Sequence, residues 1–171
     1  SETPCICFVP QGVAQQSIES FFGTTADAGK TLTKGNLRLL VIPFVPQNDY
    51  DKLLWACDFN FVRGEDSFVR AQWAQRPFVW HIYPQDENLH HKKLRAFLNI
   101  FNPATSALKT LNLAWNEVQD PANWYKLWKQ TQCECPQIQQ ESELWVQKMH
   151  KNGDLSANLL KFARTLRQIR P

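Results

Sequence analysis

The sequence has little that would mark a secreted or metal-binding protein. Its five cysteines are an odd number, include two Cys-x-Cys pairs and form no framework of a small disulfide-rich domain. They are Cys5, Cys7, Cys57, Cys133 and Cys135. Neither these pairs nor His90 and His91 have the Cys-x2-Cys or His-x3-His spacing that zinc sites usually show, so a zinc site is the less favoured alternative. We expect reduced cysteines in a cytosolic protein, and no metal site.

The sequence also has no long apolar run and no strong excess of charge. No run approaches the ~20 residues that span a bilayer, and the first residues lack the basic segment and apolar core of a secretory signal. A net charge of +3 and a pI of about 8.6 can help to attract a phosphorylated ligand or an acidic protein but identify neither. The basic residues near the C-terminus fit one solvated helix face: Lys161, Arg164, Arg167 and Arg170. We expect neither a membrane nor a nucleic acid as partner.

Two common nucleotide-binding motifs are missing. No Gly-x-Gly-x-x-Gly occurs, which argues against a dinucleotide-binding oxidoreductase. Segment 23–31 resembles a phosphate-binding P-loop, but it has five residues between its glycines where the motif needs four. It also leads from a predicted helix into a predicted strand, the reverse of a P-loop. A P-loop NTPase is therefore disfavoured.

From residue 4 to about 86, short β-branched runs alternate with segments that repeat apolar residues at three- and four-residue spacing. This alternation predicts βα units and a parallel sheet flanked by helices, hence an α/β fold. We expect strands at 5–9, 37–44, 59–62 and 78–82. We expect helices at 14–22, 49–57 and 66–74.

After Gln85 the character changes to a run of helices, which Pro103, Pro121, Pro136 and Gly153 punctuate. We expect them at 89–101, 105–115, 122–128, 142–150 and 155–169. Four tryptophans at near-helical spacing are expected in the core: Trp115, Trp124, Trp128 and Trp145. Residues 1–171 are therefore predicted to form one domain, with βα repeats in 1–86 and helices of 87–171 packing on the sheet.

In open α/β sheets, ligands bind at the carboxyl ends of the strands, where the following helices direct their N-terminal amides into one crevice. The loops at this edge are 10–15, 44–50, 63–67 and 83–88. The third loop is the most informative, because a glycine and polar residues join its strand to its helix.

Loop 63–67 combines features that suit a diphosphate. Gly64 lets the backbone come close to a ligand. Ser67 and its neighbours leave amides unpaired in the first helical turn, while Arg63 and Arg70 supply positive charge. We therefore expect a phosphate-binding site here.

Glu65 and Asp66 in the same loop do not suit a phosphate. A carboxylate repels a phosphate by about 1 kcal/mol at about 4 Å even in water, so we expect these side chains to face sugar or ribose hydroxyls, or a cationic acceptor group. The structural alternative is that Asp66 is the N-cap of the helix and pairs with Arg70 four residues later. That alternative does not account for Glu65.

The second and fourth loops carry aromatic and amide side chains suited to a flat base. Phe44 can pack on a pyrimidine and Gln47 can bond to the base or the ribose, but Phe44 ending a buried strand is an equal alternative. Tyr83 and Gln85 join the site on the same reasoning. His81 shares a face with Tyr83, and a lone histidine in a strand is more often structural than catalytic.

Residues 54–74 and 76–85, together with 43–47, closely resemble the family of elongation factor P arginine rhamnosyltransferases, EarP. The longest matching stretch reads Leu-Trp-Ala-Cys-Asp-Phe-Asn-Phe-Val-Arg-Gly-Glu-Asp-Ser-Phe-Val-Arg-Ala-Gln-Trp-Ala. The helical remainder is more loosely similar. Family members often have glycine where this chain has Gln75, which is a surface change.

The resemblance implies an inverting, metal-independent glycosyltransferase of the two-domain GT-B type with Rossmann-like domains. Such an enzyme transfers rhamnose from dTDP-β-L-rhamnose to one arginine of the bacterial translation factor EF-P. The chain resembles only the C-terminal, donor-binding domain. The family's N-terminal acceptor domain carries an aspartate thought to act as general base, so this chain alone is expected to be inactive.

The resemblance also assigns roles to residues of this chain. Glu65 and Asp66 are expected to support catalysis, and with Arg63 and Ser67 they belong to the part of the donor site around the diphosphate and the sugar. The remaining donor-site residues surround the nucleotide: Phe44, Gln47, Tyr83 and Gln85. The other open interpretation is a non-catalytic α/β module that docks a protein partner.

Overall fold

The computed structural model describes residues 3–101, 104 and 106–169. The chain divides into two compact units, an N-terminal unit Ser1–Tyr50 and a C-terminal unit Asp51–Pro171, where the sequence led us to expect one domain. Each unit contains a small β-sheet with helices, so the expected α/β fold class is confirmed at this level. The strands expected in one sheet lie in two.

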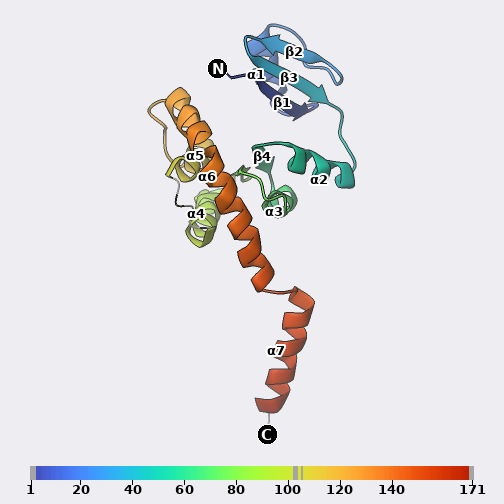
Figure 1. Cartoon of the computed structure of the whole chain (residues 1–171), viewed down its shortest axis with the longest axis vertical. Helices are drawn as coiled ribbons and strands as arrows, with labels where there is room; N and C mark the ends of the chain where they lie inside the picture. The colour runs from blue at the N-terminus through green and yellow to red at the C-terminus, as the bar shows by residue number, and fades with distance from the viewer. Residues whose placement is uncertain (1–2, 102–103, 105, 170–171) are drawn as a thin grey trace. The chain divides into compact units, whose positions relative to one another are not determined.

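The N-terminal unit contains β1 (Cys5–Pro10), α1 (Gln15–Phe22), β2 (Thr31–Lys34) and β3 (Leu37–Ile42). Its sheet has the order β1-β3-β2, with β1 parallel and β2 antiparallel to β3 (Figure 1). The sequence did not predict β2, so the expectation of a purely parallel sheet is wrong for this unit. A tight turn at Gly35 and Asn36 joins β2 to β3, with Gly35 at a φ of 57°, so a glycine hairpin signal was available in the sequence.

The core of the N-terminal unit lies between α1 and the sheet. Alternate residues of β3, Leu39 and Val41, face inward, as the two-residue period of a half-buried strand requires. Ile18 of α1 and Leu32 of β2 pack against them, with Phe22 at the edge. The predicted strands and helix of this unit differ from the observed ones by one or two residues, and β3 ends at Ile42, not at residue 44.

The C-terminal unit is built around a second pair of parallel strands, β4 (Asn60–Arg63) and β5 (Phe78–His81). Between them in sequence lies α3 (Glu65–Trp73), which gives the βαβ connection expected from the pattern. The helix α2 (Gln47–Ala56) begins in the last residues of the N-terminal unit and precedes β4, and its buried residue is Leu54. A short 3-10 turn, η1 (Asp86–Asn88), follows β5.

The second half is helical, as predicted: α4 (Leu89–Phe101), α5 (Ser106–Trp115), α6 (Trp124–Lys151) and α7 (Leu155–Ile169). The predicted start of α5 at Thr105 lies outside the described residues. Of the four tryptophans expected in the core, Trp128 and Trp145 are partly buried, whereas Trp115 and Trp124 are exposed, so the core prediction is wrong for the latter two. No helix in the described part of the chain is long and apolar enough to cross a bilayer.

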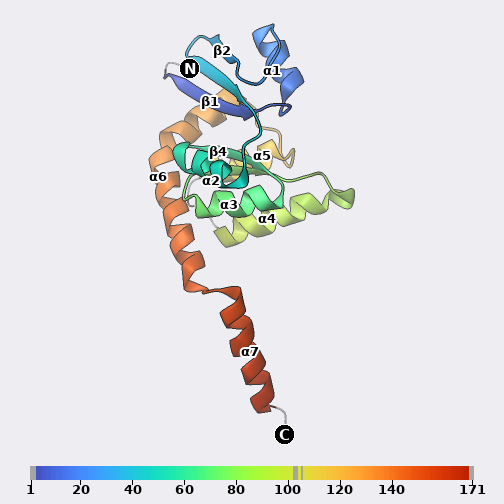
Figure 2. The same cartoon turned by 90° about the vertical axis from the view of Figure 1, so that its right-hand side faces the viewer.

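The predicted break at Pro136 does not occur, because α6 is one continuous helix (Figures 1 and 2). Proline removes one backbone donor and crowds the preceding turn, which costs a helix about 3 kcal/mol. Pro136 is exposed, so the carbonyl that loses its partner can bind water. One face of the helix is buried on both sides of the proline, through Thr131, Ile138 and Ser142. Burial of this continuous face outweighs the cost of the proline.

Candidate functional site

The junction between β4 and α3 contains the loop 63–67, which the sequence predicted as a ligand site. Gly64 is the N-cap of α3, with φ 78° and ψ −179°, a conformation that is essentially restricted to glycine. Its carbonyl accepts a 3.0 Å hydrogen bond from Trp80 Nε1. A Cβ atom at this position would lie 2.9 Å from Cε2 of Tyr83. Glycine is therefore required at this position both for the backbone angle and for the close approach of the Tyr83 ring.

Because its N-cap is glycine, α3 begins without a capping side chain. The first amides of an α-helix have no partner within the helix and carry its positive dipole end, so this end can bind an anion. Arg63 lies directly before the cap, and its guanidinium carbon is 4.6 Å from the centre of the exposed Tyr83 ring. Among the described residues no carboxylate pairs with Arg63, so its charge adds to that of the helix end.

Arg70, the second predicted cation, is already paired. Its Nη1 donates to both oxygens of Asp51, at 2.9 and 2.8 Å, and its Nε donates to Asp66 at 2.9 Å. Hydrogen bonding to Asp51 first, and then to Asp66, raises the pKa of Arg70. The expectation that Arg70 supplies free charge to a phosphate is therefore wrong, because two carboxylates neutralise it.

The acidic residues of the loop occupy the first turn of α3. Asp66 forms the i, i+4 ion pair with Arg70 that the sequence suggested, but it is not the N-cap, since Gly64 holds that position. Glu65 is exposed at the first helical position and Ser67 is partly exposed two residues later. The junction thus presents two carboxylates beside the amide end of the helix.

The loop after β5 is fixed by a buried histidine. Nδ1 of His90 accepts a 3.1 Å hydrogen bond from the backbone amide of Gln85. The neighbouring His91 bonds through Nε2 to the carbonyl of Asn116, at 3.0 Å. Both histidines of the less favoured zinc alternative thus bond to backbone groups. In the part of the chain that the structure describes, no three His, Cys, Asp or Glu side chains gather as a metal-binding group.

His81 ends β5 directly opposite Arg63 in the sheet register. Burial, and then the positive charge of Arg63, lower the pKa of His81, while Glu117 raises it to a lesser extent. His81 is therefore a neutral, partly buried strand residue at neutral pH, in agreement with its structural interpretation from the sequence.

The predicted site residues fall into both units. Phe44 and Gln47 belong to the N-terminal unit, and the other six belong to the C-terminal unit. Phe44 is 81% exposed, so the alternative that it ends a buried strand is wrong. Gln47 is the first residue of α2.

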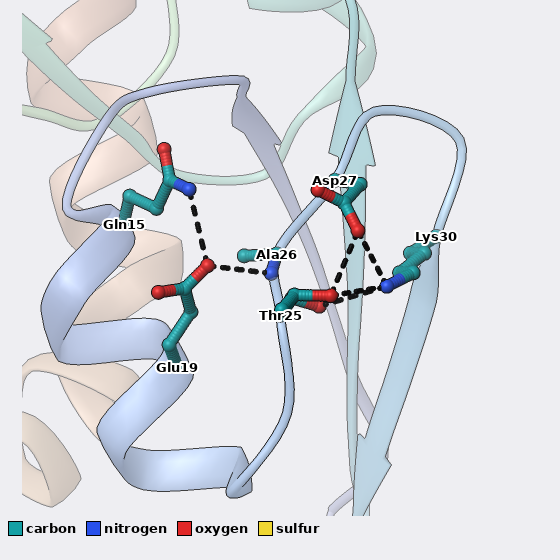
Figure 3. A network of polar contacts seen from close by, with 6 residues as sticks. All are labelled: Gln15, Glu19, Thr25, Ala26, Asp27 and Lys30. Carbon is teal, nitrogen blue, oxygen red and sulfur yellow. Dashed lines mark hydrogen bonds and ion pairs between the residues drawn. The ribbon is translucent and has the colours of Figure 1, made fainter.

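The P-loop-like segment 23–31 leads from α1 into a strand and not into a helix, as expected, although that strand is the unpredicted β2 and not the strand expected at 37–44. Its lysine is held by its own loop: Lys30 Nζ bonds to Asp27 at 2.5 Å and also to the Thr25 hydroxyl (Figure 3). Glu19 accepts 3.0 Å hydrogen bonds from the Ala26 amide and from Gln15, as Figure 3 also shows. The bond from Lys30 is the first cause of the lowered pKa of Asp27. The only lysine of this motif is thus neutralised.

Sequence reasoning missed the role of three residues that shape the site, namely Trp80, His90 and Asn116, and had considered His90 only as a possible zinc ligand. Each bonds to the backbone of a residue at or next to a predicted loop, over separations of 16, 5 and 34 positions. Only the fold brings these partners together. The chain is thus an α/β protein whose junction between β4 and α3 can hold an anion next to carboxylates.

Comparison with known proteins gives the family. The family model described as Elongation-Factor P (EF-P) rhamnosyltransferase EarP matches residues 1–164. The protein-arginine rhamnosyltransferase of Pseudomonas putida is 42% identical over 170 residues, and that of Pseudomonas aeruginosa is 41% identical over 165. These alignments cover 96% and 93% of this chain. The chain therefore belongs to the EarP family, which confirms the resemblance found in the sequence.

A solved structure agrees with this assignment. It concerns the structural basis for EarP-mediated arginine glycosylation of translation elongation factor EF-P, and it matches this chain with a TM-score of 0.81 at 38% identity. The match covers 96% of this chain and 53% of that chain. This chain spans less than half the length of the two Pseudomonas relatives, 44% and 43%.

Proposed function

We propose that this chain is the donor-binding half of a bacterial enzyme that transfers rhamnose from dTDP-β-L-rhamnose to an arginine of EF-P. Membership of the EarP family supports the reaction, because the relatives are named protein-arginine rhamnosyltransferases. The observation that carries the donor assignment is the start of α3, where a glycine cap leaves the first-turn amides without a capping side chain beside Arg63. The GT-B arrangement and a cytoplasmic location are part of the same proposal.

The diphosphate is the part of the donor that this junction fits best. Phosphate oxygens can accept from the amides at the start of α3, and Arg63 can leave the Tyr83 ring to pair with them. Gly64 has no side chain of its own at this end of the helix, and the Tyr83 ring packs over it, so the phosphate is proposed to approach the first-turn amides beside that ring. In this proposal, binding needs no metal ion, since the helix end and Arg63 supply the positive charge.

The neighbouring side chains suit the two ends of the donor. Glu65, Asp66 and Ser67 are proposed to bond to hydroxyls of the sugar, because carboxylates and hydroxyls at the first turn lie beside the diphosphate position. Tyr83 and Gln85 are proposed to contact the nucleotide from the loop after β5. Phe44 and Gln47 remain predicted nucleotide contacts on the sequence pattern alone.

The proposed transfer inverts the anomeric centre of the sugar. A guanidinium nitrogen of the acceptor attacks the anomeric carbon, the bond from that carbon to the diphosphate oxygen breaks, and dTDP leaves with the electron pair. Because the guanidinium is protonated at ordinary pH, a carboxylate must orient it and a base must take the proton that it loses. We assign that base to the part of the relatives' length that this chain does not span.

The proposal is tested by titrating dTDP into the chain while amide NMR shifts are followed. We expect localised shifts at Arg63, Glu65 and Tyr83. An Arg63→Met variant should bind dTDP about ten-fold more weakly, since it loses a charged partner of the phosphate. A Lys30→Met variant is the matched control and should bind normally, because Lys30 belongs to its own loop network. No response at millimolar dTDP would favour the protein-docking alternative.

A further inference from the structure

The strand β5 is bonded along both of its edges, although the described sheet gives it only one neighbouring strand. One edge pairs with β4. Along the other edge lie two asparagines, Asn112 of α5 and Asn116 in the turn directly after it, which are only 1% and 5% exposed. Their amide groups bond to the strand in the way a neighbouring strand would.

The two asparagines have matching contacts one helical turn apart. Oδ1 of Asn112 accepts from the Trp80 amide at 3.1 Å, and its Nδ2 donates to the carbonyl of Phe78 at 3.5 Å. Oδ1 of Asn116 accepts from the Ile82 amide at 2.9 Å, and its Nδ2 donates to the Trp80 carbonyl at 2.7 Å. Each Nδ2 also donates to the carbonyl four residues earlier in α5.

Only Asn116 reaches the end of the strand that carries the predicted donor loop. Ile82, its partner, directly precedes Tyr83, whose ring packs against Gly64 and Arg63. The backbone carbonyl of Asn116 also accepts from His91 at the start of α4.

The far side of the same loop is held by α4. His90, next to His91, accepts the amide of Gln85. The loop from Tyr83 to Gln85 is thus fixed before its first residue by Asn116 and at its last residue by His90. The His91 bond ties these two anchors to each other.

We infer that Asn116 is a positioning residue for the donor site: it holds the end of β5 so that Tyr83 and Gln85 are preorganised for the nucleotide. The inference rests on the proposed function for the role of the loop. The structural part of the inference depends only on the contacts described above. The Asn116 side chain accepts from the Ile82 amide, and its backbone carbonyl accepts from His91. Preorganisation lowers the ordering cost of binding, so loss of Asn116 should weaken binding without removing any ligand contact.

Asn112 provides a matched control. Asn112→Leu and Asn116→Leu each remove two hydrogen bonds to the backbone of residues 78–82 and one to the carbonyl four residues earlier, all from buried positions, so both should lower the midpoint of thermal unfolding to a similar extent. Only Asn116→Leu should weaken dTDP binding, by about ten-fold, as measured by calorimetric titration of the whole chain.

Hydrogen exchange of the Gln85 amide tests the loop directly, because this amide bonds to His90 and not to either asparagine. Asn116→Leu should speed its exchange about ten-fold relative to the parent chain and to Asn112→Leu. If Asn116→Leu does not fold, Asn116→Asp keeps the oxygen that accepts from Ile82 and should show a smaller effect of the same sign.

The outcomes separate this inference from the proposed function. Equal Gln85 exchange in the Asn112 and Asn116 variants overturns the inference, and so does an equal loss of dTDP affinity in both. If the parent chain does not bind dTDP, the proposed donor role fails. Gln85 exchange alone then decides whether Asn116 positions the loop.

Discussion

At the scale of single residues, Gly64 is the glycine at which an added Cβ would meet the closest contact, 2.9 Å from the Tyr83 ring. Gly64→Ala should lower the free energy of unfolding by about 2–4 kcal/mol, because the backbone is in a region reserved for glycine and the new methyl group meets the Tyr83 ring. Urea denaturation measures this loss.

Gly35→Ala is the control for the backbone angle alone. Gly35 also has a positive φ, but no atom lies within 4 Å of an added Cβ, so a loss of only about 1–2 kcal/mol is expected. Combining Gly64→Ala with Tyr83→Ala should recover the part due to the clash. Equal losses of stability in the two glycine variants would show that the contact with Tyr83 does not contribute to the loss at Gly64.

His81 gives the chain a predictable response to acid. Its pKa in the folded chain is lowered from the ordinary value of 6.5 by burial and by Arg63. The unfolded chain therefore binds more protons as the pH falls through 6.5, and this contribution to stability is present above that pH and lost below it. Its slope cannot exceed about 1.4 kcal/mol per pH unit.

This pH response can be measured by urea denaturation between about pH 5 and pH 7.5. His81→Gln should show a shallower fall in stability than the parent chain over this range, since glutamine does not titrate. In Arg63→Met, NMR titration should show a higher His81 pKa. A parent His81 that titrates at or above 6.5 would contradict the prediction.

The sequence identified the residues of loop 63–67 because a strand, a glycine and a helix start are local features. It could not supply the partners that decide what each side chain does. Arg70 was predicted to face a phosphate, but Asp51, 19 positions earlier, binds it. Asn116 and Trp80 are 36 positions apart. Such contacts depend on how the elements pack, which no local pattern contains.

At the scale of secondary-structure elements, the helices and strands that the sequence predicted best are those in which period and boundary signals agree. The helices α4 and α7 have their predicted bounds. The strand β2 was missed because it is only four residues long and a single position, Leu32, is buried. The long helix α6 was divided in two because a proline was given more weight than the continuous apolar face around it.

Replacing Pro136 tests how much the proline costs the continuous helix α6. Pro136→Ala restores a backbone donor at an exposed position and should raise the free energy of unfolding by about 1–3 kcal/mol. Gln137→Ala, at the next exposed position, should change stability by less than about 0.5 kcal/mol. A fall in stability on replacing Pro136 would mean that the proline fits a bend that the helix requires.

At the scale of the whole molecule, the sequence predicted the α/β class and the order of the elements apart from β2 and the continuous helix α6, but it did not predict the division into two units. Alternation of strands and helices does not say which strands share a sheet. Two separate hydrophobic clusters mark the units, one around Ile18 and Leu39 and the other around Val79 and Leu111. The site residues were predicted as one set, and they are distributed over both units.

Ligand-dependent stability of the whole chain tests the proposed donor without a catalytic assay. A ligand that binds only the folded chain adds about 2.7 kcal/mol to its stability at 100 times its Kd. We expect dTDP to raise the midpoint of thermal unfolding, and thymidine to raise it much less, because thymidine lacks the phosphates proposed to bind at the start of α3 and at Arg63. The shift by dTDP should persist in EDTA, since helix amides and Arg63 supply the positive charge in this proposal. Equal shifts by both ligands would place the diphosphate elsewhere, and loss of the shift in EDTA would show that a metal ion carries the charge instead.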